Sequence, residues 1–139
     1  MKLDAHYLSK SIGLLNPKPP IMVLPDAPLS GVLEKLKDES GGAVLICDED
    51  DKLLGIFTER DVLKKVVLSQ VKQESVEIGS LMTINPMTVS MTSPLGYALQ
   101  LMTEGGFRHV PIVSENGDAL GVLAMKDVVD EIVKSFVLK

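Results

Sequence analysis

The chain has 139 residues, of which 45% are hydrophobic and 24% charged, and its formal net charge is −5. This length fits one compact domain or two small interdependent halves. The acidic balance argues against a sequence-independent grip on nucleic acid, and a content of only 4% aromatic residues argues against stacking platforms for single strands.

Apolar runs are too short for a membrane span of roughly 20 residues, and the first residues lack the apolar core of a signal peptide. Cys47 is the single cysteine and lies inside an apolar run, so an internal disulfide is excluded and a buried reduced thiol is favoured. We therefore expect a cytoplasmic protein that has no membrane association.

The first predicted elements are a short leader helix within residues 1–11, a strand over Ile21–Leu24, and a helix that opens after Asp26 and Pro28. One apolar stripe of that helix faces the core, formed by Leu29, Val32, Leu33 and Leu36. Gly41 and Gly42 are expected to end it, because glycine readily adopts the left-handed conformation beyond a helix C-terminus.

A β-hairpin is predicted next, with strands over residues 44–47 and 53–57 on either side of an acidic turn, Asp48–Asp51. That turn is a conceivable cation site, but nothing else in the sequence converges on it. A solvated loop is therefore favoured, and no metal site is predicted.

The second hairpin strand runs into Gly55–Asp61, an apolar stretch that ends in a hydroxyl and a carboxylate. This switch predicts a strand that enters a helix, where Thr58 caps free N–H groups and Asp61 reaches back in a capping box. Such a junction is ordinary helix punctuation, but it is also a possible phosphate or hydroxyl site.

The junction recurs 66 residues later as Gly121–Asp127, and the same offset relates many further pairs without a gap. They include Ile12 with Ile78, Pro20 with Pro86, Val23 with Val89, Val44 with Val110, and Leu54 with Leu120. Two copies of one structural unit are therefore predicted: a leader at 1–11, a first repeat at 12–68, a linker at 69–77 and a second repeat at 78–139.

Each copy has the predicted order strand, helix, strand, strand, helix, which indicates a mixed α/β fold. A unit of about 60 residues buries only a modest fraction of its surface, so we expect the two to pack through their sheets with pseudo-two-fold symmetry. The closing helices carry Val62, Val66, Val128 and Ile132, and we expect these stripes to be exposed and to support a homodimer.

With these motifs and their duplication, the chain resembles a tandem pair of CBS (cystathionine β-synthase-type) domains, a Bateman module. The residues that carry the resemblance are Pro20–Val23 with Pro28–Leu29, Asp48–Asp61, Leu81–Pro86 and Arg108–Val113. The resemblance implies a regulatory module without catalytic residues that binds AMP, ADP, ATP or another adenosine derivative and modulates an unidentified partner or fused domain.

The family's site residues carry over to two predicted clefts. The first comprises Thr58, Glu59, Arg60 and Asp61 with Met87, Arg108, His109 and Lys126. The second comprises Ala124, Met125 and Asp127 with Ile21, Gly42 and Ala43. It departs from the family pattern, because Ala124 has no hydroxyl and Gly42 and Ala43 replace a basic pair, so we expect weaker binding there.

Plainer interpretations remain open at this stage. Arg108 and His109 also fit a solvated strand edge, Met87 a wall residue, and Asp127 a favourable charge in a first helical turn. An enzyme is a poor rival, since the sequence shows no catalytic triad or metal-ligand cluster. A dimerisation or interaction scaffold without ligand is the second rival.

Overall fold

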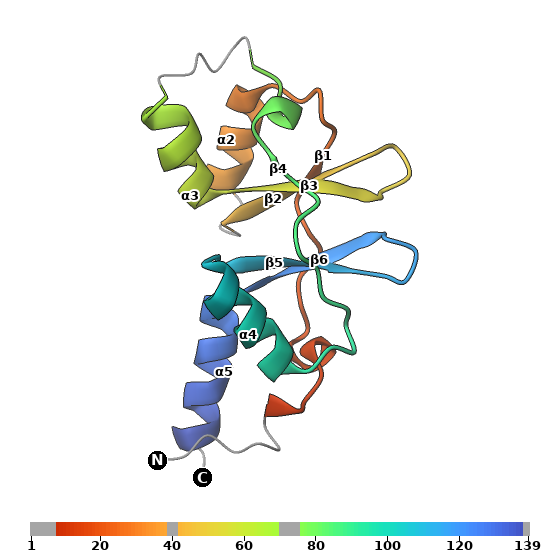
Figure 1. Cartoon of the computed structure of the whole chain (residues 1–139), viewed down its shortest axis with the longest axis vertical. Helices are drawn as coiled ribbons and strands as arrows, with labels where there is room; N and C mark the ends of the chain where they lie inside the picture. The colour runs from red at the N-terminus through yellow and green to blue at the C-terminus, as the bar shows by residue number, and fades with distance from the viewer. Residues whose placement is uncertain (1–7, 39–41, 70–75, 138–139) are drawn as a thin grey trace. The chain divides into compact units, whose positions relative to one another are not determined.

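The computed structural model describes residues 8–38, 42–69 and 76–137. Its elements are, in chain order (Figure 1), η1 (Ile12–Leu15), β1 (Met22–Val23), α2 (Leu29–Asp38), β2 (Ala43–Cys47), β3 (Leu53–Thr58), α3 (Glu59–Asp61), η2 (Val62–Val67), η3 (Ile78–Ser80), β4 (Thr83–Ile84), α4 (Leu95–Gly105), β5 (His109–Val113), β6 (Ala119–Ala124) and α5 (Met125–Val137). The predicted leader helix lies largely outside the described residues. None of the helices in the described ranges is long and apolar enough to cross a membrane.

The chain folds into two compact units, each described by itself below. The Asp61 unit comprises residues 20–86 and 116–119. The Asp127 unit comprises residues 1–19, 87–115 and 120–139. These units differ from the two sequence repeats, because each includes the segment that begins the other repeat.

The Asp61 unit is built on a four-stranded sheet with the order β1-β2-β3-β4. Strands β2 and β3 form the predicted antiparallel hairpin, β1 lies parallel to β2, and β4 pairs antiparallel with β3. Its core is made by apolar side chains of α2, β2, β3, η2 and η3: Leu29, Val32, Leu36, Val44, Ile46, Phe57, Val66 and Ile78.

The Asp127 unit repeats this plan with a shorter sheet, β5-β6. Val89 forms a single parallel bridge with Ile112, which is the counterpart of the β1–β2 pairing 66 residues earlier. Helix α4 ends at a left-handed glycine, because Gly106 has a φ of 71° and its N–H donates to Met102 O. The core comprises Ile12, Val89, Leu95, Ala98, Leu101, Met102, Val110, Ile112, Leu123 and Val128.

The leading segments of the two repeats are exchanged between the units. Ile78 N donates to Ala27 O at 2.8 Å in the Asp61 unit, and Ile12 N donates to Ser93 O at 2.9 Å in the Asp127 unit. These two hydrogen bonds are equivalent under the 66-residue shift. Strand β4, which the sequence analysis did not predict, follows from the same exchange.

Gly55 shows why the repeated motif begins with glycine. A Cβ at this position would lie 2.7 Å from Thr83 O and 2.6 Å from the sulfur of Met82. A side chain would therefore push β4 away from β3. Gly121 is the equivalent position, but the constraint is weaker there, since an added Cβ would lie 3.1 Å from Lys18 O.

The helix after Asp61 forms as predicted, but its second part, η2, has π-helical geometry. The expectation that Val62, Val66, Val128 and Ile132 form an exposed stripe was wrong. Val66 and Val128 are buried in the cores of their own units, and Val62 and Ile132 pack against those cores. The exposed apolar side chains of η2 and α5 each follow one of these residues by one position in the sequence. They are Leu63, Val67, Val129 and Val133.

Candidate ligand-binding site

The strand-to-helix junction of the Asp61 unit contains the predicted capping box. Thr58 N donates to Asp61 Oδ2 at 2.9 Å, and Asp61 N donates to Thr58 Oγ1 at 3.4 Å. Thr58 Oγ1 also lies 3.2 Å from Asp61 Oδ2 and donates to it. The single hydroxyl proton of Thr58 is thus directed at Asp61, so Thr58 acts on the site by holding that carboxylate.

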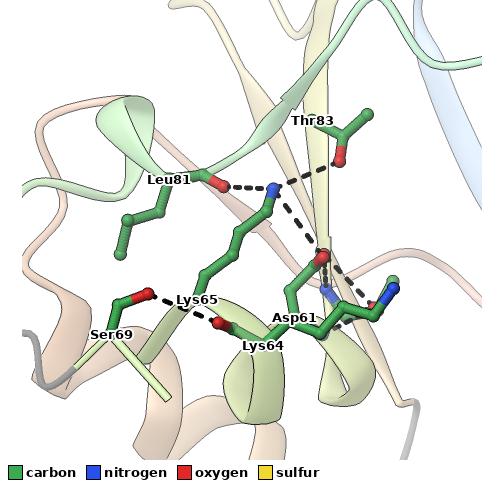
Figure 2. Close-up of polar contacts among 7 residues, drawn as sticks. Asp61, Lys64, Lys65, Ser69, Leu81 and Thr83 are labelled. Atoms are coloured by element: carbon green, nitrogen blue, oxygen red, sulfur yellow. Dashed lines mark hydrogen bonds and ion pairs between the residues drawn. The ribbon is translucent and has the colours of Figure 1, made fainter. Parts of the chain in front are cut away.

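Lys65 approaches the other carboxylate oxygen of Asp61 (Figure 2). Its Nζ lies 3.7 Å from Asp61 Oδ1, donates to Leu81 O at 2.7 Å, and lies 3.4 Å from Thr83 Oγ1. The Asp61 side chain is only 15% exposed and that of Lys65 is 34% exposed. Asp61 is therefore fixed on both sides, by its own capping box and by a cation anchored on the β4 segment.

Two of the residues assigned to the second cleft lie at this same junction. Gly42 O accepts a hydrogen bond from Glu59 N at 3.0 Å, and Ala43 is the strand partner of Thr58. Gly42 has a φ of 74° and is buried, as is Ala43. Glu59 and Arg60 are exposed in the first turn after Thr58.

Ile21 lies further along the same sheet. Its carbonyl accepts a hydrogen bond from Leu45 N at 2.9 Å just before β1. The Ile21 side chain packs partly buried against the core of the Asp61 unit. Ile21 thus packs against the core of that unit, and its β2 partner, Leu45, follows Ala43 by two residues.

The Asp127 unit carries the equivalent junction with a different chemistry. Met125 N donates to Arg108 O at 2.8 Å, which is the counterpart of the bond from Glu59 to Gly42. Ala124 ends β6 without a hydroxyl, and Asp127 is exposed in the first turn of α5. This carboxylate is therefore not held by a threonine side chain, in contrast to Asp61.

The remaining predicted residues all belong to the Asp127 unit. Arg108 is exposed just before β5, His109 is half-buried at its start, and Met87 is 54% exposed. Lys126 Nζ donates to Asp130 Oδ2 at 2.7 Å along α5, and this bond raises the pKa of the lysine. Each predicted cleft combines residues of both units, and that grouping stays a prediction.

The acidic hairpin turn is organised by its own backbone. Asp48 Oδ1 accepts hydrogen bonds from Asp50 N at 2.9 Å and from Lys52 N at 3.0 Å. Among the described residues, no group of three or more His, Cys, Asp or Glu side chains is arranged to hold a metal ion. The carboxylate of Asp48 thus serves the turn itself.

The sequence profile of the CBS domain matches this chain twice, over residues 14–68 and 78–134. The chain belongs to the CBS domain family. This confirms the resemblance drawn from the repeated motifs. The matches fall within the predicted repeats at 12–68 and 78–139, whose boundaries stay a prediction. Each matched CBS domain contains one strand-to-helix junction, Thr58–Asp61 in the first and Ala124–Asp127 in the second.

Among its relatives, the uncharacterized protein MK0525 of Methanopyrus kandleri is 31% identical over 120 residues, which cover 86% of this chain and 61% of that protein. The CBS domain-containing protein CBSCBSPB5 of Arabidopsis thaliana is 40% identical over 81 residues, which cover 58% of this chain but only 15% of that protein. The chain thus spans less than two thirds of the length of these relatives.

Solved structures share the fold of the CBS pair. The protein ATU1752 of Agrobacterium tumefaciens has a TM-score of 0.79 at 31% identity and covers 88% of this chain and 98% of its own. The CBS pair of MJ0100, solved with 5′-methylthioadenosine and S-adenosyl-L-methionine, has a TM-score of 0.82 at 21% identity and covers 91% and 98%. PAE2072 of Pyrobaculum aerophilum, complexed with AMP, has a TM-score of 0.79 at 23% identity and covers 89% and 98%.

Proposed function

We propose that this chain is a regulatory module that binds an adenosine ligand, such as AMP, ADP, ATP or another adenosine derivative, at a site built on Asp61. The carboxylate of Asp61 carries the proposal. Its Oδ2 is used by the capping box, whereas Oδ1 faces a cation at 3.7 Å and keeps acceptor capacity for the hydroxyl hydrogens of a ribose. A held carboxylate loses little conformational entropy on binding.

The ligands of the fold neighbours support this ligand class. AMP, 5′-methylthioadenosine and S-adenosyl-L-methionine were found with proteins of the same fold, and adenosine is the part that they have in common. Recognition through the ribose and adenine is the simplest chemistry that serves all three. The module would transmit occupancy to a partner protein or a fused domain, and a cytoplasmic location suits its single reduced cysteine.

Thermal unfolding with and without ligand tests the proposal. A ligand that binds only the native state stabilises it by about 2.7 kcal/mol at a hundredfold excess over Kd. We expect adenosine ligands to raise the melting temperature, Asp61→Ala to abolish most of the shift, and Glu49→Ala, an exposed carboxylate of the same unit, to preserve it. A wild-type chain that shows no shift with any adenosine ligand at millimolar concentration would refute the proposal.

An interaction scaffold is the second candidate function. It is favoured by the exposed apolar side chains of η2 and α5, since Leu63, Val67, Val129 and Val133 are 44 to 59% exposed. Such side chains suit a homodimer or another protein partner. The two functions are compatible, because a dimer of this chain can also bind a ligand.

A further inference from the structure

Lys65 is a charged side chain that the motif analysis did not single out. It follows Asp61 by four residues, a spacing that places two side chains on the same helix face. What distinguishes it from an ordinary surface pair is the second anchor, because its ammonium group donates to the carbonyl of Leu81 at 2.7 Å. Figure 2 shows its side chain extending from η2 toward both Asp61 and the β4 segment.

The position of the ammonium group is over-determined. Three acceptors from two segments surround it: Asp61 in α3, and Leu81 and Thr83 in the β4 segment. Two of its three N–H donors are hydrogen-bonded, to Leu81 O and Thr83 Oγ1, and Asp61 Oδ1 pairs with its charge at 3.7 Å. Lys65 therefore stands as a fixed positive charge beside Asp61, and the half-buried location limits its screening by salt.

This fixed charge changes what the Asp61 site can accept. A lone carboxylate that binds ribose hydroxyls also repels any phosphate carried on the same ribose, because like charges separated by less than the Debye length of roughly 8 Å are only partly screened. A cation 3.7 Å from Asp61 Oδ1 offsets that repulsion within the Debye length of roughly 8 Å. It leaves the hydrogen-bonding of the carboxylate unchanged.

We propose that Lys65 is a positioning and specificity-determining residue that makes the Asp61 site tolerant of phosphorylated adenosine ligands. The inference rests on the proposed function of that site. Lys65 holds the carboxylate for the ribose and neutralises it for the phosphate, so its charge separates AMP from neutral adenosine ligands. Lys64 provides a matched control: it is the adjacent lysine, its side chain is exposed, and its backbone carbonyl accepts from Ser69 Oγ.

The test is calorimetric titration of the purified chain with AMP and with 5′-methylthioadenosine, which carries the same adenine and ribose but no phosphate. Lys65→Gln should weaken AMP binding about tenfold and 5′-methylthioadenosine binding by less than about threefold. Lys65→Arg should restore AMP binding, and Lys64→Gln, which removes the same net charge, should change either affinity by less than about twofold. Raising the salt concentration should also reduce the preference of the wild-type chain for AMP over 5′-methylthioadenosine, because salt screens the charge of Lys65.

Equal weakening of both ligands by Lys65→Gln would assign Lys65 a purely structural role and overturn the inference. An equal loss in Lys64→Gln would also overturn it, because bulk charge would then be the cause. A wild type that binds neither ligand would refute the proposed function itself. That result is distinct from a wild type that binds both while its lysine variants leave the two affinities unchanged, which refutes the role of Lys65 alone.

Discussion

Lys52 Nζ lies 2.6 Å from Asp118 Oδ1, and these two residues occupy equivalent positions 66 residues apart in the repeats. Two backbone hydrogen bonds flank them, from Leu53 N to Gly117 O at 3.1 Å and from Ala119 N to Asp51 O at 3.0 Å. The two bonds are equivalent under the 66-residue shift, because Leu53 corresponds to Ala119 and Asp51 to Gly117. These contacts are thus equivalent in sequence, and the two repeats differ so that opposite charges stand where identical copies would place like charges.

The first prediction concerns this ion pair. Asp118→Asn should cost less than about 1 kcal/mol of unfolding free energy, because both side chains are 39% exposed. Asp118→Lys should cost more, since it sets two cations opposite each other. The double variant Lys52→Asp with Asp118→Lys should recover most of that loss in urea unfolding. A swap as damaging as Asp118→Lys alone would show that the pair contributes no charge complementarity.

The second prediction compares the two helix starts. Thr58→Ala should lower the free energy of unfolding by about 1 kcal/mol, because it removes the acceptor for Asp61 N, whereas Thr58→Ser retains that acceptor. Ala124→Thr should raise it by up to about 1 kcal/mol, since Asp127 already stands at the third position for a capping box. Thermal unfolding measures both. A loss of stability in Ala124→Thr would show that the second junction has a different local geometry.

The capping box, the hairpins and the repeat were predictable because they depend on neighbouring residues or on a register visible in the sequence. Thr58 and Asp61 are three residues apart, and their spacing alone indicates the contact. The exchange of leading segments was not predictable, because residues 12–19 and 78–85 match each other and local patterns do not reveal which unit receives which. Strand β4 was missed for this reason.

The contacts of Lys65 were missed for a related reason. Its spacing from Asp61 was a usable signal, since a lysine four residues after an aspartate on a helix favours an ion pair. Its stronger contact is with Leu81 O, which depends on β4 lying beside β3. The spacing of apolar and polar side chains along the sequence cannot predict a hydrogen bond to the backbone carbonyl of a residue 16 positions away.

The third prediction uses Cys47, which is buried in β2. Burial, and the nearby carboxylates of Asp51 and Asp48, raise the pKa of this thiol from 9.0 to about 11. Because the folded pKa is the higher one, the unfolded chain loses its proton first, and stability that is complete below pH 9 declines between about pH 9 and pH 11. The slope of unfolding free energy against pH in this window should be shallower in Cys47→Ala than in wild type. Identical slopes would contradict the assignment.

The fourth prediction concerns self-association through the exposed apolar residues of η2 and α5. Sedimentation at micromolar concentration should give a homodimer, and Val133→Glu, which places a charge among the exposed apolar side chains of α5, should shift it toward monomer. Glu131→Gln, a charge change at a partly buried position of α5, is the control. A wild-type chain that sediments as a monomer with and without nucleotide would contradict the dimer.

The last prediction is that the two repeats bind ligand unequally. Asp61 is held by Thr58 and Lys65 and is only 15% exposed, whereas Asp127 follows an alanine and is exposed. Arg108 and His109, if they complete the Asp61 site as predicted, add contacts to phosphate that Gly42 and Ala43 cannot match. Hydrogen bonds to charged groups contribute roughly 1.5–3 kcal/mol each, so losing two weakens binding on the order of a hundredfold or more.

Titration with AMP should therefore fit about one tight site per chain. Arg108→Ala should weaken that site, Asp61→Ala should remove most of its affinity, and Asp127→Ala should leave it nearly unchanged. The comparison between the two aspartates is the sharpest, because they are equivalent positions of one motif and differ in what holds them. Two equal sites would show that holding the carboxylate adds no affinity. A greater loss from Asp127→Ala than from Asp61→Ala would show that the unheld carboxylate binds the nucleotide better than the fixed one.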